Sequence, residues 1–136
     1  MPVCTPVPVG DQDEIIDQYI DQSGQTMQTT ASGLRYVIET PGTGDNIDYG
    51  NTVELEYQGV LLDGTDFDSG TLGPLVLNQN TFIPGFEEGI QLFNEGAEGL
   101  IVIPGALAYG CFPPIGSVIG DNDVLVFSIT VLSVDP

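Results

Sequence analysis

The sequence contains no histidine, no lysine and a single arginine, Arg35, among its 136 residues. Histidine and lysine are the side chains that most often activate a nucleophile near neutral pH. Without them, a serine or cysteine nucleophile has no strong base beside it. We therefore expect no chemistry that depends on such a pair, and we expect Arg35 to be a surface ion-pair partner without a catalytic role.

Positive charge is correspondingly scarce, since 20 acidic residues face one basic residue and give a formal net charge of -19. Nucleic-acid binding requires Lys and Arg to neutralise phosphates, so this composition argues against nucleic acid and acidic membranes as partners. The acidic surface would either steer basic peptides toward the chain or simply stay hydrated at high salt. We adopt the second interpretation.

Long apolar runs are also absent. A transmembrane helix needs about 20 mostly apolar residues in succession, and we therefore expect no membrane span. The length and the 41% content of hydrophobic residues fit one domain with a core of its own.

The two cysteines, Cys4 and Cys111, are too few and too far apart in sequence to indicate a disulfide framework or a zinc site. We expect both to be free, unless Cys4 has a role in processing. No signal peptide with a basic n-region precedes Cys4, so we expect a mature or trimmed chain, or a cytoplasmic one.

Calcium binding is the one metal hypothesis that the acidic residues suggest, through Asp63, Asp66 and Asp68 or through Asp121 with Asp123. An EF-hand loop that starts at Asp66 would need Glu at its twelfth position, where Leu77 stands. We therefore predict no metal site and no cofactor.

Residues 1–30 are predicted to form a proline-containing tether followed by a short amphipathic helix over residues 12–22. Asp11 and Glu14 resemble a capping pair. An apolar stripe at helical spacing follows, formed by Ile15, Ile16, Tyr19 and Ile20. We expect this stripe to pack on the main domain, and dimerisation is the alternative role.

Residues 31–136 have the alternation and turn punctuation of a β domain. Val53, Leu55 and Tyr57 alternate with polar residues, which predicts a strand with one buried face. Pro74 predicts an edge strand or a bulge, because proline cannot donate to a central ladder. The predicted strands cover residues 34–38, 53–58, 72–77, 100–103 and 124–134.

One short helix is predicted after Pro84, because Phe86, Ile90 and Phe93 follow the i, i+4, i+7 spacing. It is the only candidate to cover the apolar faces of the strands. The predicted fold class is therefore α+β, a curved antiparallel sheet of about five strands wrapped around one short helix, with the short N-terminal helix in addition.

Several ordered motifs resemble the FKBP-type peptidyl-prolyl cis/trans isomerases over residues 31–136. The motifs are Gly33-Leu34 with Tyr36-Val37, Tyr57-Gln58-Gly59, Asp63-Gly64 with Phe67-Asp68-Ser69, Phe82-Ile83-Pro84-Gly85-Phe86-Glu87-Glu88-Gly89, Ile103-Pro104, Ala108-Tyr109-Gly110 and Leu125-Val126-Phe127. That family folds as a curved antiparallel sheet around a short helix, in agreement with the prediction from the residues alone.

The resemblance implies a non-covalent isomerase of Xaa-Pro bonds that assists protein folding and needs no cofactor. Phe86 would be the floor of an aromatic pocket with Asp68 and Tyr109 at its rim, and the N–H of Ile83 would bond a substrate carbonyl. The catalytic residues implied are Tyr57, Phe67, Asp68, Tyr109 and Phe127. The substrate-binding residues implied are Phe82, Ile83, Phe86, Ile119 and Leu75.

The implied partners are proline-containing peptides or unfolded proteins, macrolide immunosuppressants among small molecules, and no second subunit.

Three departures from the family pattern bear on the implied activity and ligands. Phe86 stands where the family often has Trp, and Gly73 stands near a position that is commonly aromatic, which leaves one wall open or filled by Leu75. The loop 111–123 keeps Ile119 but lacks the prolines after it. A non-catalytic module that binds proline segments is the alternative function.

The N-terminal residues Asp13-Glu14-Ile15-Ile16-Asp17-Gln18-Tyr19-Ile20 and Thr30-Ala31-Ser32-Gly33-Leu34 are similar to the leaders of envelope FKBP-type lipoproteins of some Gram-negative bacteria. The similarity implies a lipid anchor at Cys4, and an ordinary free thiol is the alternative. It favours the cell envelope over the cytoplasm as the location.

Overall fold

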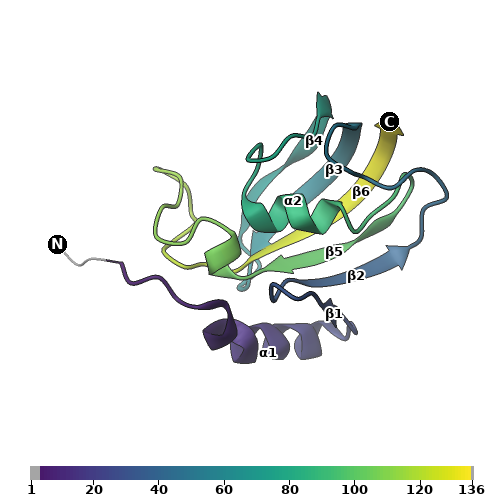
Figure 1. Ribbon diagram of the computed structural model, residues 1–136. Helices are drawn as coiled ribbons and strands as arrows, with labels where there is room; N and C mark the ends of the chain where they lie inside the picture. Colours follow the sequence, from purple (N-terminus) through teal and green to yellow (C-terminus); the bar gives the residue numbers. More distant parts are fainter. Residues whose placement is uncertain (1–3, 136) are drawn as a thin grey trace.

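Strand β6, Leu125–Asp135, lies inside a six-stranded antiparallel sheet in the computed structural model, which describes residues 4–135. The order across the sheet is β1-β2-β5-β6-β3-β4 (Figure 1). The other strands are β1 Gln28–Thr29, β2 Arg35–Thr40, β3 Thr52–Leu61, β4 Asp66–Val76 and β5 Glu98–Ile103. The predicted antiparallel sheet is confirmed, and the two-residue strand β1 is an addition to it.

Helix α2, Pro84–Ile90, covers the concave face of the sheet (Figure 1). Proline at the first helical turn suits a start at this point, because its missing N–H is not needed there. Phe86 and Ile90 share one face of the helix and are buried, as is Phe93 just beyond its end. They pack against the inward face of β6, whose residues Leu125, Phe127, Ile129 and Val131 belong to the same core.

A second helix, α1, Asp13–Ser23, packs on the opposite face of the sheet. Ile16 and Ile20 lie one turn apart and are buried against Val102 of β5 and Val126 of β6. Val126 lies between Leu125 and Phe127, so its side chain points to the other side of the strand. The N-terminal stripe thus packs on the main domain, as predicted, although Ile15 is exposed. The expectation that α2 alone covers the sheet is wrong.

Strand β4 is one of the two edge strands of the sheet, and the prediction from Pro74 is confirmed. Leu72 pairs with Leu55 and Leu75 pairs with Val53, so Gly73 and Pro74 stand opposite a single residue of β3, Glu54. A bulge of this kind changes which side chains of the edge strand face inward.

The N-terminal segment is tied to the domain by a disulfide between Cys4 and Cys111, which are 107 residues apart in sequence. The expectation of two free cysteines is therefore wrong. The pairing was not visible in the spacing because the segment 4–12 crosses the base of the loop 105–123 only once the chain is folded. Neither helix in residues 4–135 combines the length and the apolar character needed to cross a membrane.

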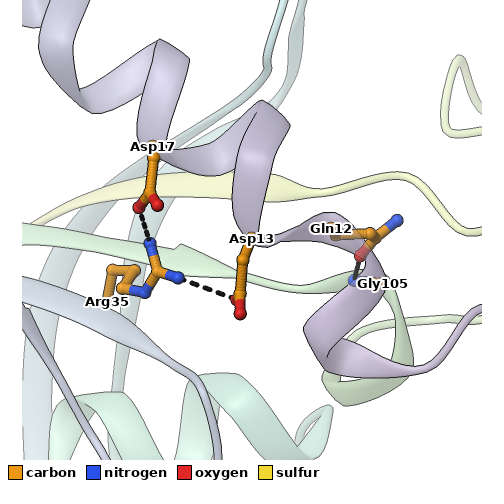
Figure 2. Close-up of polar contacts among 5 residues, drawn as sticks. All are labelled: Gln12, Asp13, Asp17, Arg35 and Gly105. Atoms are coloured by element: carbon orange, nitrogen blue, oxygen red, sulfur yellow. Dashed lines mark hydrogen bonds and ion pairs between the residues drawn. The ribbon is translucent and has the colours of Figure 1, made fainter.

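Arg35 is buried rather than on the surface, with only 6% of its area exposed. It donates from Nη1 to Oδ1 of Asp17 at 2.5 Å and from Nη2 to Oδ1 of Asp13 at 2.8 Å (Figure 2). The predicted ion pair is confirmed, and its burial is a correction. The one cation of the chain thus joins α1 to β2. The division of the chain into residues 1–30 and 31–136 stays a prediction.

We expect Asp17→Ala to lower the free energy of unfolding by about 1–2 kcal/mol, because a buried guanidinium loses one carboxylate partner. Asp21→Ala is the matched control, since Asp21 lies one turn later on α1 and its side chain makes no hydrogen bond among the described residues. Both variants remove one negative charge, and urea unfolding compares them. Equal stability of the two variants would contradict the assigned ion pair.

Candidate active site

A cavity of about 480 Å³ opens where the concave face of the sheet meets α2. Three strands and α2 supply its walls, together with the loop before α2 and the segment before β6. Its lining residues are Tyr57, Phe67, Asp68, Leu72, Thr81, Phe82, Ile83, Phe86, Tyr109, Pro114, Ser117, Ile119 and Phe127. A mostly apolar concavity with a few polar groups at its edge is the usual form of a small-ligand site.

Phe127 is the centre of the aromatic cluster in this cavity. Its ring lies 5.0 Å from that of Phe86 at an interplanar angle of 74°, and 5.4 Å from that of Phe67 at 88°. Such edge-to-face pairs are favoured by the ring quadrupoles. Tyr57 and Phe82 extend the cluster, at 6.2 Å from Phe127 and 5.1 Å from Phe86 respectively. The rings hold one another in place before any ligand arrives.

Gly59 of β3 makes room for this arrangement. A Cβ atom at Gly59 would lie 2.4 Å from Cζ of Phe67 and 3.0 Å from Cε1 of Phe127. Glycine is therefore required where two rings cross the strand, for reasons of space rather than of backbone dihedrals. Phe86 and Phe127 are only 3% and 6% exposed, so they form the floor of the cavity rather than its rim.

The polar rim contains Tyr57, Asp68 and Tyr109. The hydroxyl of Tyr57 donates a hydrogen bond to Oδ2 of Asp68 at 2.7 Å. Partial burial, and then the hydrogen bond to the Asp68 carboxylate, raise the pKa of Tyr57 to about 12. At neutral pH, Tyr57 is therefore a phenol that orients Asp68.

The pKa of Tyr57 predicts a pH dependence. Because the folded state holds the phenol proton more tightly than the unfolded chain, the contribution of Tyr57 to stability is complete below the ordinary pKa of 10.0 and is lost as pH rises toward about 12. We expect the Tyr57 ring signal to titrate near pH 12 in NMR spectra, and nearer its ordinary pKa in Asp68→Ala. Titration of Tyr57 at the same pH in both proteins would contradict the assigned bond.

The loop that carries Phe82 and Ile83 is held by Glu87 of α2. Oε2 of Glu87 accepts from the Phe82 N–H at 2.7 Å, and Oε1 accepts from the Asn80 N–H at 3.2 Å and from the Tyr49 hydroxyl at 3.1 Å. Glu87 is buried. Within the described residues, the N–H of Ile83 has no protein acceptor. The main-chain N–H of Ile83 can therefore donate a hydrogen bond to a ligand.

Nine of the ten predicted site residues line this one cavity, and Leu75 does not. Leu75 packs on the core opposite Val53, while Leu72, which the sequence did not single out, forms the wall. A side chain at Gly73 is not possible without rearrangement, since its Cβ would lie 2.3 Å from the carbonyl oxygen of Val53.

Sequence reasoning also missed Thr81, Pro114 and Ser117 as lining residues, and Glu87 as the support of the loop. In the sequence, Glu87 appeared only as part of the motif that follows Phe82. The only hint in the sequence that Glu87 supports this loop was its position five residues after Phe82.

The first three acidic residues considered for calcium accept hydrogen bonds from other parts of the chain. Asp63 accepts from the Thr65 N–H, Asp66 from Gln58 and Asp68 from Tyr57. In the part of the chain that the structure describes, no three His, Cys, Asp or Glu residues are placed to hold a metal ion.

The family model described as FKBP-type peptidyl-prolyl cis-trans isomerase matches residues 44–132. A probable FKBP-type peptidyl-prolyl cis-trans isomerase FkpA of Neisseria meningitidis is 41% identical over 110 residues, which are 79% of this chain and 40% of that protein. The outer membrane protein MIP of Legionella longbeachae is 40% identical over 105 residues, 76% of this chain and 45% of that protein.

Solved structures agree with these relatives. The crystal structure of FkpA from Escherichia coli superposes with a TM-score of 0.75 at 29% identity and covers 94% of this chain and 61% of that one. A peptidyl-prolyl cis-trans isomerase from Pseudomonas syringae superposes with a TM-score of 0.73 at 28% identity and covers 97% and 99%. The chain spans less than half the length of the two curated relatives.

Proposed function

We propose that this chain, which belongs to the FKBP-type peptidyl-prolyl cis-trans isomerase family, accelerates rotation about Xaa-Pro peptide bonds in its aromatic cavity. The observation that carries the proposal is the largely apolar cavity of about 480 Å³, at whose rim the phenol of Tyr57 donates a hydrogen bond to the carboxylate of Asp68. Proline-containing peptides and unfolded proteins are the proposed substrates.

The reaction suits a site without a nucleophile. Rotation about a peptide bond crosses a barrier of about 18–20 kcal/mol because resonance gives the C–N bond partial double-bond character, and no covalent bond breaks. The planar amide is more dipolar than the twisted one. A dry apolar cavity therefore destabilises the ground state more than the transition state. Each tenfold acceleration requires only about 1.4 kcal/mol of such difference.

Each of the nine predicted site residues that line the cavity has a role in this proposal. Phe86 and Phe127 support the proline ring from below, and Phe67 and Tyr57 border it. The free N–H of Ile83 binds a substrate carbonyl, which fixes the peptide while the prolyl bond turns. Asp68 and Tyr109 receive the polar main chain at the rim, and Phe82 and Ile119 close the sides.

Asp68→Ala tests the role of the rim, and we expect kcat/KM for a proline peptide to fall about tenfold, which corresponds to one lost charge-assisted hydrogen bond. Asp66→Ala is the matched control. Asp66 lies two residues earlier on β4 and accepts a comparable bond from Gln58 at 2.8 Å, but it does not line the cavity. We expect the control to keep the wild-type rate.

An equal loss in both Asp variants would remove the special role of Asp68. A folded wild-type protein that leaves the peptide at its uncatalysed rate would reject the isomerase itself. In that case, shift changes at Phe67 and Tyr109 on adding the peptide would support the second candidate, a non-catalytic module that binds proline segments. The observation that favours this second candidate is that Phe86 gives the cavity a smaller floor than the Trp that the family often has at this position.

The proposal extends to macrolide immunosuppressants as ligands of the same cavity, because its lining is largely apolar. Such a ligand should compete with the proline peptide.

A lipid anchor at Cys4 is not included, since the disulfide occupies the sulfur that would carry the lipid. Disulfides persist in oxidising compartments, which supports a location outside the cytoplasm. The intact mass of the protein from its native host distinguishes the disulfide from the lipid.

A further inference from the structure

Gln12 is a buried polar residue, 6% exposed, at the end of the short helix η1, Val9–Gln12. Its Oε1 accepts a hydrogen bond from the Gly105 N–H at 2.8 Å, and its Nε2 donates to the carbonyl oxygen of Asn122 at 2.7 Å. Figure 2 shows the side chain of Gln12 directed at Gly105. One amide thus joins two main-chain groups that are 17 residues apart in sequence.

Gly105 and Asn122 are the two ends of the segment that closes one side of the cavity. Four lining residues lie between them, namely Tyr109, Pro114, Ser117 and Ile119. The ends approach closely, because a Cβ at Gly105 would lie 2.4 Å from the carbonyl oxygen of Asn122. The Asn122 N–H donates to the Gly110 carbonyl at 2.8 Å, so the same point also fixes the residue after Tyr109.

Apart from the disulfide at Cys111, the middle of this segment has little support of its own. Phe112 is 87% exposed and Ile115 is fully exposed, so these large side chains add nothing to the core. The segment is therefore held by the disulfide at Cys111 and by the contacts at its two ends. These contacts come from the N-terminal residues, since the Asn122 side chain accepts from the Val7 N–H and donates to the Thr5 carbonyl.

We propose that Gln12 is a positioning residue of the cavity, which sets the place of Tyr109 and Ile119 by bridging Gly105 and Asn122. The inference rests on the proposed function for its kinetic consequence. Gln12 touches no substrate and lies outside residues 44–132, which the family model matches. An amide is suited to this place because it can accept from one end of the segment and donate to the other.

The test compares Gln12→Met with Gln18→Met in the oxidised protein. Methionine is close in size to glutamine but cannot make either hydrogen bond. Gln18 is an exposed glutamine of α1 whose side chain makes no hydrogen bond among the described residues. We expect Gln12→Met to raise KM for the proline peptide about three- to tenfold, with kcat within about twofold, because a net hydrogen bond is lost from the support of the cavity. We expect Gln18→Met to match the wild type.

NMR spectra of the free proteins separate this inference from the proposed function. We expect the amide signals of Tyr109 and Ile119 to shift or broaden in Gln12→Met and to stay in place in Gln18→Met, whether or not the wild type is an isomerase. Unchanged signals, or an unchanged KM in an active protein, would overturn the inference. Should Gln12→Met not fold, Gln12→Glu replaces it in the test. This variant keeps the acceptor for the Gly105 N–H but loses the donor to the Asn122 carbonyl, and we expect the same change in the amide signals of Tyr109 and Ile119.

Discussion

The Phe127→Ala variant is expected to lose the acceleration of prolyl isomerisation entirely. Phe127 contacts the rings of Phe67, Phe86 and Tyr57, so its removal opens the floor of the cavity and leaves these three rings without their common neighbour. Water then enters the space where the prolyl amide must lie, and the advantage of a dry site disappears. A protease-free assay with a proline peptide measures the loss.

The stability of this variant needs its own control, because a buried Phe→Ala change costs about 3–5 kcal/mol. Phe127→Leu keeps more of the volume, and we expect it to reduce kcat/KM at least about tenfold while it remains folded. Phe93→Leu is the matched comparison, since Phe93 is buried in the same core but does not line the cavity. Equal activities of the two Leu variants would contradict the central place of Phe127.

Removal of the disulfide by Cys4→Ser with Cys111→Ser is expected to lower the free energy of unfolding by about 2–4 kcal/mol. The bond joins residues 107 apart, so it restricts most of the unfolded chain. The unfolded state without the bond is more expanded. We therefore also expect a larger dependence of the unfolding free energy on urea concentration.

The reductant supplies the control for this prediction. The chain has only two cysteines, so a reducing agent should lower the stability of the wild type to that of the double Ser variant and leave the variant unchanged. A wild type that is equally stable with and without reductant would show that Cys4 and Cys111 are not joined.

The local patterns of the sequence were sufficient to predict most of the fold. The alternation of Val53, Leu55 and Tyr57 indicated the buried face of β3, and the spacing of Phe86 and Ile90 indicated α2, because both signals depend only on neighbouring residues. The aromatic site residues followed from ordered motifs. The rigid sheet then brings residues from distant motifs together.

The features that were missed depend on contacts between distant segments. The bulge at Gly73 and Pro74 was anticipated, yet its effect on the facing of Leu72 and Leu75 depends on the register with β3, which no local pattern records. The disulfide and the two hydrogen bonds of the Gln12 side chain likewise form only when the N-terminal segment packs against the loop 105–123 in the folded chain. Burial of a polar side chain such as Gln12 is invisible until its partners are known.

Exchange spectroscopy by NMR on one proline peptide tests the central claim, that the aromatic cavity turns a prolyl amide without covalent chemistry. Uncatalysed exchange takes tens to hundreds of seconds, too slow to give cross-peaks between the cis and trans forms. With catalytic amounts of the oxidised wild type, we predict cross-peaks that vanish with Phe127→Ala. A wild type whose cavity signals move on binding the peptide, while the cross-peaks stay absent, would contradict the account.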